Sequence, residues 1–177
     1  MKTYLKKLIN SLFWILDKCN KQAYIKTYPK YLQWLGIQID TDNGDSWFSP
    51  TVFFDSTDYA AISLGRNCTL SFDVVILVHD YSINNAKRYQ NKRAEHDKHD
   101  MIVSRVSIGD NCFIGARAII LPGSKIENNC IIGSGSVVRG LVAEGSVVAG
   151  NPARVVSSLE RLSEKYEGSS LVVKDRR

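Results

Sequence analysis

A period of six residues in the central part of the chain constrains the fold more than any other feature of this sequence. Large aliphatic side chains recur at that interval without a slip, at Ile108, Ile114, Ile120, Ile126, Ile132 and Val138. An earlier block shows the same pattern at Leu64, Leu70 and Ile76. An amphipathic helix repeats its apolar residues every three or four positions, and a half-buried strand every two. The period of six fits neither and indicates a short strand followed by a turn, repeated along the chain.

Three such units form a coil of about 18 residues with a triangular cross-section, in which the large side chains fill the interior. Neighbouring coils then pair as parallel strands about 4.8 Å apart. Cys112 and Cys130 are 18 residues apart, so we expect them to stack at one corner as small buried side chains. The other cysteines, Cys19 and Cys68, create no CxxC spacing. A disulfide framework or a zinc site is therefore disfavoured, and a reducing compartment fits better.

Three stretches, residues 106–117, 131–138 and 149–156, carry a resemblance to a known family. They resemble the hexapeptide-repeat acyltransferases, and they are most similar to bacterial sugar O-acetyltransferases of the maltose, galactoside and surface-polysaccharide type. The resemblance covers about residues 47–156. It implies a mainly β chain built on a left-handed parallel β-helix. The handedness comes from the family, because ordinary parallel crossovers are right-handed.

The remaining segments are predicted to flank this β-helix. Residues 1–46 should form an N-terminal helical cap, with an apolar stripe over residues 4–16. A second helical element over residues 24–35 is expected to be interrupted at Pro29. Solenoids need such caps, because their terminal coils would otherwise expose the core.

At the other end, residues 157–177 are predicted to form a short C-terminal helix and a tail. A capping box formed by Ser157 and Glu160 opens this helix. Residues 47–156 form the β-helix itself, with a protruding loop at about residues 82–105.

Charge is distributed unevenly. Residues 1–36 hold seven lysines and one acid, Asp17, whereas the other 141 residues hold 16 basic and 17 acidic side chains, a net charge of −1. The main body therefore lacks the basic surface of a nucleic-acid-binding protein. The longest apolar run near the N-terminus is also far shorter than the roughly 20 residues of a spanning helix. We expect a cytoplasmic protein, and a second hypothesis places residues 1–36 on the inner face of an anionic membrane as a basic amphipathic helix.

His79 is the candidate catalytic residue. It ends an apolar stretch and lies fifteen residues after Leu64, which opens the turn at residues 64–67. In the family that the chain resembles, the catalytic histidine follows an Ile-Gly-x-Asn turn at about this spacing and precedes an aspartate. The resemblance therefore implies that His79 is a general base, which an imidazole can be near neutral pH. A structural histidine at a strand end is the alternative.

A general-base histidine needs a partner at its other ring nitrogen, which fixes the tautomer. Asp58, Asp73 and Asp80 are carboxylates near His79 in the sequence, and a backbone carbonyl would serve equally. The sequence does not choose among them.

The predicted loop at about residues 82–105 interrupts the repeat and contains the other two histidines, His96 and His99. A polar loop of this length is usually functional or disordered. We expect this loop to help select the acceptor. The alternative is a solvent-exposed loop with no role in function. A zinc enzyme similar to the gamma-class carbonic anhydrases is disfavoured, because these histidines lie three residues apart in a charged loop instead of on the coils. No metal is expected.

The resemblance also implies a site for acetyl-CoA between neighbouring subunits, beside the C-terminal coils. Ala116 and Ser134 match positions that would offer backbone groups to the pantetheine amides, and Arg154 would meet the phosphates. Arg139 lies one position before the place where the family often has a lysine, and it could supply that charge. For Ala116 and Ser134, the geometry of the repeat is a competing explanation.

Together these features predict a homotrimer that transfers an acetyl group from acetyl-CoA to a hydroxyl of a sugar or a surface-polysaccharide precursor. The acceptor could be a free sugar, a nucleotide-linked sugar or a lipid-linked glycan. An N-acetyltransferase acting on an amino-sugar is the nearest alternative, because the same histidine could serve an amine. A non-enzymatic β-helix scaffold is the alternative from a different class, although the presence of His79 and Arg154 argues against it.

Overall fold

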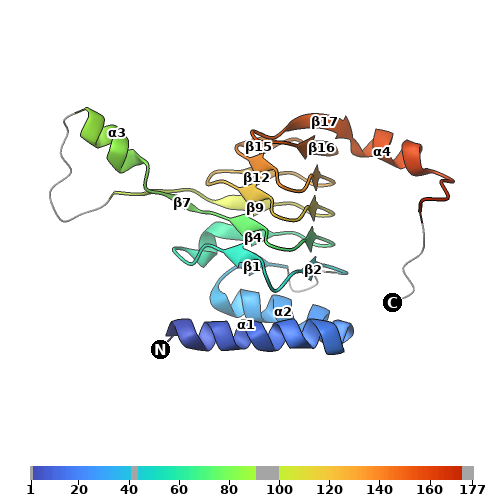
Figure 1. Ribbon diagram of the computed structural model, residues 1–177, viewed down its shortest axis with the longest axis horizontal. Coiled ribbons are helices and arrows are strands. Elements are labelled where there is room, and N and C mark those ends of the chain that lie inside the picture. The colour runs from blue at the N-terminus through green and yellow to red at the C-terminus, as the bar shows by residue number, and fades with distance from the viewer. Residues whose placement is uncertain (1, 41–43, 91–99, 173–177) are drawn as a thin grey trace.

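The computed structural model describes residues 2–40, 44–90 and 100–172, and it shows a prism of stacked coils with helices at both ends (Figure 1). Three sheets form the sides of the prism. Sheet A contains β1 (Gln38–Ile39), β4 (Ile62–Leu64), β9 (Val106–Ile108), β12 (Lys125–Ile126) and β15 (Leu141–Val142). Sheet B contains β2 (Trp47–Phe48), β5 (Thr69–Leu70), β10 (Phe113–Ile114), β13 (Ile131–Ile132), β16 (Ser146–Ala149) and β17 (Arg154–Ser158). Sheet C contains β3 (Phe53–Phe54), β6 (Val75–Ile76), β11 (Ile119–Ile120) and β14 (Val137–Val138).

The three sheets are parallel, except that β17 pairs antiparallel with β16. All nine large aliphatic residues of the six-residue pattern are buried and form the core of the prism. The coils therefore have the triangular section that the period predicted. Because β1 already pairs with β4, the prism begins within residues 1–46.

Three corners join the sheets in the order A, B, C and back to A. The A/B corner includes residues 65–68, 109–112 and 127–130. The B/C corner includes residues 71–74, 115–118 and 133–136. The C/A corner includes residues 55–61, 77–90, 100–105, 121–124 and 139–140. These corners carry many of the polar side chains of the prism.

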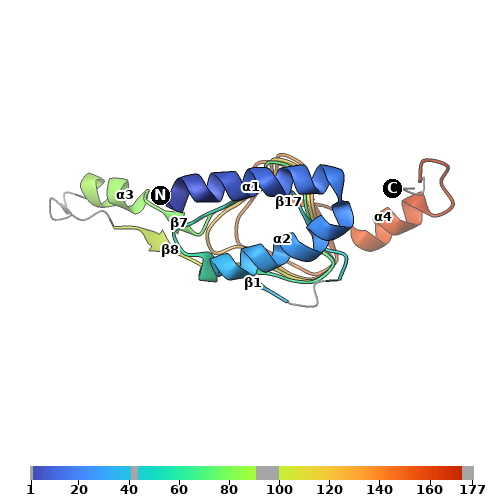
Figure 2. The same ribbon diagram turned by 90° about the horizontal axis from the view of Figure 1, so that it is seen from below.

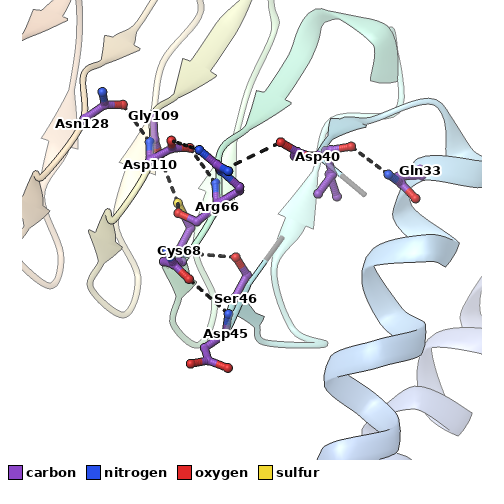
Figure 3. Close-up of polar contacts among 11 residues, drawn as sticks. Gln33, Asp40, Asp45, Ser46, Arg66, Cys68, Gly109, Asp110 and Asn128 are labelled. Carbon is purple, nitrogen blue, oxygen red and sulfur yellow. Dashed lines mark hydrogen bonds and ion pairs between the residues drawn. The ribbon is translucent and has the colours of Figure 1, made fainter. Parts of the chain in front are cut away.

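The A/B corner shows how closely successive coils pack (Figure 3). The backbone N–H of Arg66 donates to Asp110 Oδ1 at 2.8 Å, and the N–H of Asp110 donates to Asn128 Oδ1 at 2.9 Å. The hydrogen bond from Arg66 lowers the pKa of Asp110. A Cβ at Gly65 would lie 2.6 Å from the carbonyl carbon of Gly109, so only glycine fits there. The contacts at this corner are structural.

Cys68, Cys112 and Cys130 stack at the A/B corner of successive coils, and all three are buried. Each thiol donates to a backbone carbonyl of the next coil, at 3.0 to 3.2 Å. Burial raises the pKa of the Cys130 thiol. The prediction that Cys112 and Cys130 are small buried side chains at one corner is confirmed.

Helices α1 (Lys2–Cys19) and α2 (Lys21–Leu35) lie side by side across the end of the prism that carries the first coil (Figures 1 and 2). The predicted interruption at Pro29 is wrong, because α2 continues through this residue. Pro29 is buried, together with Tyr24, Tyr28 and Leu32 on the same helix. Packing of this face against the first coil offsets the backbone hydrogen bond that proline cannot make.

The C-terminal helix α4 (Leu159–Tyr166) follows β17 and points away from the prism (Figure 1). Its N-cap is Ser158, whose side chain accepts the backbone N–H of Arg161 at 3.2 Å. The capping box predicted at Ser157 is therefore wrong by one residue, because β17 extends through that position.

An arm leaves the C/A corner of the second coil and projects to the side of the prism (Figure 1). Its stem is an antiparallel ribbon of β7 (His79–Asp80) and β8 (Ile102–Val103), and it carries helix α3 (Ile83–Tyr89). The buried Asn84 ties α3 to the stem, because its amide donates to the Asp100 carbonyl at 2.7 Å and accepts the Asp100 N–H at 3.1 Å. His96 and His99 of the predicted loop lie outside the described residues.

Candidate functional site

His79 lies at the C/A corner of the second coil, where the arm begins. The preceding residue, Val78, is fully buried and anchors the strand end in the core. The side chain of His79 is 26% exposed, and its ring meets that of Tyr81 edge-on, with the ring centroids 5.1 Å apart. The imidazole is therefore held firmly and remains open to solvent on one side.

Asp55 lies at the same corner of the first coil and contacts His79 from below. Its side chain is only 3% exposed. Asp55 Oδ1 accepts the N–H of Thr57 at 3.0 Å, and Oδ2 accepts the N–H of Val78 at 3.0 Å. Oδ2 also forms a short hydrogen bond with His79 Nδ1. Both carboxylate oxygens thus accept hydrogen bonds, from groups of the same coil and of the next coil.

These hydrogen bonds decide the charge of Asp55. Burial raises the pKa of a carboxyl group, but the amides of Thr57 and Val78, the Thr57 hydroxyl and His79 outweigh burial and lower the pKa of Asp55 to about 2. Asp55 is therefore ionised at neutral pH, although it is almost completely buried.

An ionised carboxylate can only accept hydrogen bonds, and this fixes the tautomer of His79. We assign the ring hydrogen to Nδ1, which faces Asp55, with Thr57 Oγ1 2.9 Å from the same nitrogen. The lone pair of the neutral ring is then on Nε2. Nε2 is the atom of this site that can accept a proton from a bound molecule.

None of the carboxylates suggested by the sequence holds His79. Asp58 caps a single turn of 3-10 helix, Asp80 accepts the N–H of the residue two positions later, and Asp73 lies at the B/C corner. The partner is Asp55, which sequence reasoning missed.

The missed signal is the length of the first coil. Phe48 and Phe54 are six residues apart and are the inward-facing side chains of that coil. They pair with Leu70 and Ile76, which lie 22 residues later instead of 18. Had this register been recognised, Asp55 would have been placed directly below the strand that leads to the histidine.

The residues predicted to meet acetyl-CoA separate into two groups. Ala116 and Ser134 occupy equivalent positions of successive coils at the B/C corner. Arg154 follows a turn at the same corner, where the N–H of Ala153 donates to the Val137 carbonyl at 2.9 Å. Ser134 and Arg154 are exposed, and Ala116 is partly buried. The B/C corner thus presents three of the four predicted residues together.

Arg139 belongs with His79 instead, because both lie at the C/A corner. A hydrogen bond from the Ser82 backbone lowers the pKa of Asp80, and the positive charge of Arg139 adds to this effect. The width of sheet C separates Arg139 and His79 from the residues at the B/C corner. Within one chain, the structure therefore does not bring all the predicted site residues together.

Two hollows in the surface of the chain measure about 480 and 330 Å³. The larger runs along the outer face of sheet A, past Ser107 and Gly109. The smaller lies between the helical cap and the first coil, beside Tyr31 and Tyr59. His79 lines neither of these two hollows.

Potential metal ligands do not cluster in the described part of the chain. In residues 2–40, 44–90 and 100–172, no group of three or more histidine, cysteine, aspartate or glutamate side chains could hold a metal ion. The carboxylate of Asp55 is already used by the backbone and His79.

Several known proteins are similar to this chain. Residues 105–140 match the family described as bacterial transferase hexapeptide (six repeats). YvoF of Bacillus subtilis (strain 168), named as an acetyltransferase, is 32% identical over 109 residues, which are 62% of this chain and 55% of YvoF. WbbJ of Escherichia coli (strain K12), named as a lipopolysaccharide biosynthesis O-acetyl transferase, is 26% identical over 139 residues, which are 75% of this chain and 71% of WbbJ. The chain thus spans little more than half the length of YvoF.

A shorter match covers 34% of this chain and 26% of a 2,3,4,5-tetrahydropyridine-2,6-dicarboxylate N-acetyltransferase from Clostridium perfringens (strain SM101 / Type A), at 44% identity over 61 residues. Among solved structures, a galactoside acetyltransferase in complex with coenzyme A has a TM-score of 0.58 at 18% identity, covering 96% of this chain and 88% of its own. At this identity the likeness concerns the fold alone. It confirms the predicted left-handed parallel β-helix.

Asp55 should give the protein a pH-dependent contribution to stability. Its pKa in the folded protein, about 2, lies below its ordinary value of 3.8, so the contribution is present above the ordinary value and is lost as the pH falls through about 2. The contribution near neutral pH is about 2 kcal/mol. Urea unfolding of the parent and of Asp55→Asn, measured from neutral pH down to about pH 3, should show the parent's advantage shrinking as the pH falls. An advantage that stays constant over this range would contradict the assignment.

Proposed function

We propose that this chain, which belongs to the hexapeptide-repeat transferase family, transfers an acetyl group from acetyl-CoA to a hydroxyl of a sugar or a surface-polysaccharide precursor. The observation that carries the proposal is the contact between the buried, ionised Asp55 and Nδ1 of His79. A histidine that only filled space at a strand end would need no such partner. The names of YvoF and WbbJ support the reaction type.

The geometry suggests how the residues act. Nε2 of His79 accepts the proton of the acceptor hydroxyl while the hydroxyl oxygen attacks the carbonyl carbon of the thioester. An ester bond forms, the bond from carbon to sulfur breaks, and the departing sulfur takes the proton from the imidazolium. Asp55 holds the ring in place and stabilises its positive charge during the transfer. No covalent bond to the enzyme is needed.

The separation of the two corners supports a site shared between copies. Ala116, Ser134 and Arg154 lie at the B/C corner, whereas His79 and Arg139 lie at the C/A corner of the same chain. In a closed ring of identical chains, the B/C corner of one copy can face the C/A corner of its neighbour. We therefore propose that acetyl-CoA lies between two copies.

The outer faces of the sheets also support assembly through sheets B and C. The outward residues of sheet C are all apolar: Phe53, Val75, Ile119 and Val137. Those of the parallel strands of sheet B are apolar except for one threonine: Trp47, Thr69, Phe113, Ile131 and Val147. Those of sheet A are polar except for the last: Gln38, Ser63, Ser107, Lys125 and Leu141. Two sides of the prism thus have the composition of a buried interface, and the third has that of a solvated surface.

Acetyl-CoA suits the side chains at these corners. Arg139 and Arg154 are exposed, and neither belongs to an ion pair of the described residues, so both are available to phosphates. At the B/C corner, a Cβ on Gly115 would lie 2.6 Å from the Ser134 nitrogen. The small residues there leave backbone groups within reach of the pantetheine amides, although coil packing alone also requires this glycine.

The arm is proposed to help select the acceptor, because it starts at His79 and extends beyond the prism (Figure 1). Its helix α3 carries exposed polar residues and Tyr89, which is 90% exposed and could stack on a sugar ring. An amino-sugar is the second candidate acceptor, and the short match to an N-acetyltransferase supports it.

The His79→Ala variant tests the proposed reaction. Its turnover should fall by about 10²–10⁴-fold, with little change in the affinity for acetyl-CoA, because only the proton acceptor is removed. The measurement is release of the CoA thiol against a panel of sugars and amino-sugars, with acetyl-CoA affinity from calorimetry. His96→Ala and His99→Ala serve as controls and should have smaller effects. Near-full activity in His79→Ala would rule out the mechanism, and no activity of the parent on any acceptor would favour a scaffold.

The proposed trimer can be tested by its mass in solution. Light scattering at micromolar concentration should give a mass near three times the 19.8 kDa of one chain. Ile119→Glu on the outer face of sheet C should reduce the assembly to monomers, because it places a charge in the apolar interface. Ser107→Glu on sheet A is the matched control and should leave the mass unchanged. A monomeric parent would contradict a shared site.

A further inference from the structure

Helix α1 presents an apolar stripe that no other part of the described chain covers. Leu8, Leu12 and Ile15 are 59%, 58% and 50% exposed, and they lie on one face of the helix, since they are four and three residues apart. Trp14, which lies about 100° around the helix from Ile15, is also half exposed. Soluble proteins seldom leave a row of large apolar side chains open to water without a partner.

A neighbouring face of α1 packs against the rest of the protein. Phe13 and Leu16 pack against the core, and Phe13 contacts the rings of Tyr24 and Tyr28. Asp17 accepts the indole N–H of Trp47 at 3.0 Å. Figures 1 and 2 show α1 as the outermost element at this end of the molecule. The stripe therefore points away from the prism.

The helical cap that carries the stripe is rich in lysine. Lys18, Lys21, Lys26 and Lys30 are all exposed, and the ion pairs among the described residues include none of them. Residues 1–36 carry seven lysines and one acid, and the rest of the chain has a net charge of −1. The positive charge of the protein is thus concentrated on α1 and α2 together, the two helices that cover this end of the prism.

We infer that α1 docks this end of the prism on the surface of an anionic lipid bilayer. The apolar stripe would enter the boundary between headgroups and acyl chains, and the lysines would contact the anionic headgroups. No helix of the described residues is long and apolar enough to cross a membrane, so the contact is interfacial.

A second copy of the chain is a poorer occupant of the stripe. Two such ends placed face to face would bring together two strongly positive segments, and the apolar contact would have to overcome their repulsion. An anionic surface removes this repulsion and attracts the same lysines. The inference does not depend on the proposed acetyl transfer, because it rests on α1 and its charges alone.

Vesicle binding by the full chain tests the inference. The probes are vesicles of phosphatidylcholine alone and of phosphatidylcholine with about one-third phosphatidylglycerol, and the readout is co-sedimentation. The protein should bind the anionic vesicles at least about tenfold more tightly, and added salt should weaken this binding. The double variant Leu12→Glu/Ile15→Glu should lose at least about tenfold in affinity, because it replaces the exposed stripe with charge.

The matched control is Leu141→Glu, which makes the same change at a side chain that is 64% exposed on sheet A. It should bind anionic vesicles like the parent, and circular dichroism should show all variants folded. Failure of the parent to bind anionic vesicles, or equal binding by the double variant, overturns the inference. So does a parent that associates into larger particles which Leu12→Glu/Ile15→Glu splits, because the occupant of the stripe is then a second copy.

Discussion

The structure depends on the parallel pairing of each coil with the next at a fixed register. Phe54 lies opposite Ile76, and the N–H of Asp55 donates to the Ile76 carbonyl at 3.0 Å. This pairing places the carboxylate under Val78 and His79, although it lies 24 residues earlier in the chain. A site at a corner of a β-helix is therefore built from residues of successive coils, and each coil needs only one or two suitable side chains.

The register also explains how a charge can be buried beside the core. Asp55 would be costly in this position without partners, because burial disfavours the ionised form. Two backbone amides, a hydroxyl and an imidazole satisfy it, and the result is a pKa of about 2. The same contacts hold the imidazole, so the energy that stabilises the carboxylate also fixes the direction of Nε2. Structure and proposed chemistry thus rest on one set of hydrogen bonds.

Sequence reasoning predicted the inward-facing residues that follow the six-residue repeat. It missed the features of the first coil, where the repeat is irregular. The period of six predicted the inward residues, such as Ile114 and Ile132, because filling a triangular interior leaves little choice. It could not predict Asp55, because the first coil is 22 residues long and its register follows from two phenylalanines outside the regular pattern. The predicted break at Pro29 failed for a related reason, since tertiary packing of α2 outweighed a local preference.

The sequence suggested candidate site residues other than Asp55, but it did not predict their division between two corners. Single positions such as Ser134 and Arg139 can be matched to a motif, whereas the corner on which each lies follows only from which sheets their strands join. The tautomer of His79 likewise needs three-dimensional contacts. The corner of each residue and the tautomer of His79 both depend on contacts between coils. A pattern along the sequence does not contain these contacts.

The central claim is that one active site takes His79 from one copy and the B/C corner from its neighbour. Mixed assemblies of His79→Ala and Ser134→Trp test it most directly, because each variant damages a different corner and Ser134 is exposed enough to accept the larger ring. Either variant alone should be inactive. In a closed ring mixed at random in equal amounts, about a quarter of the sites would combine two intact corners, so about a quarter of the parent activity should return. If the mixture is no more active than the separate variants, the site lies within a single chain and the account is wrong.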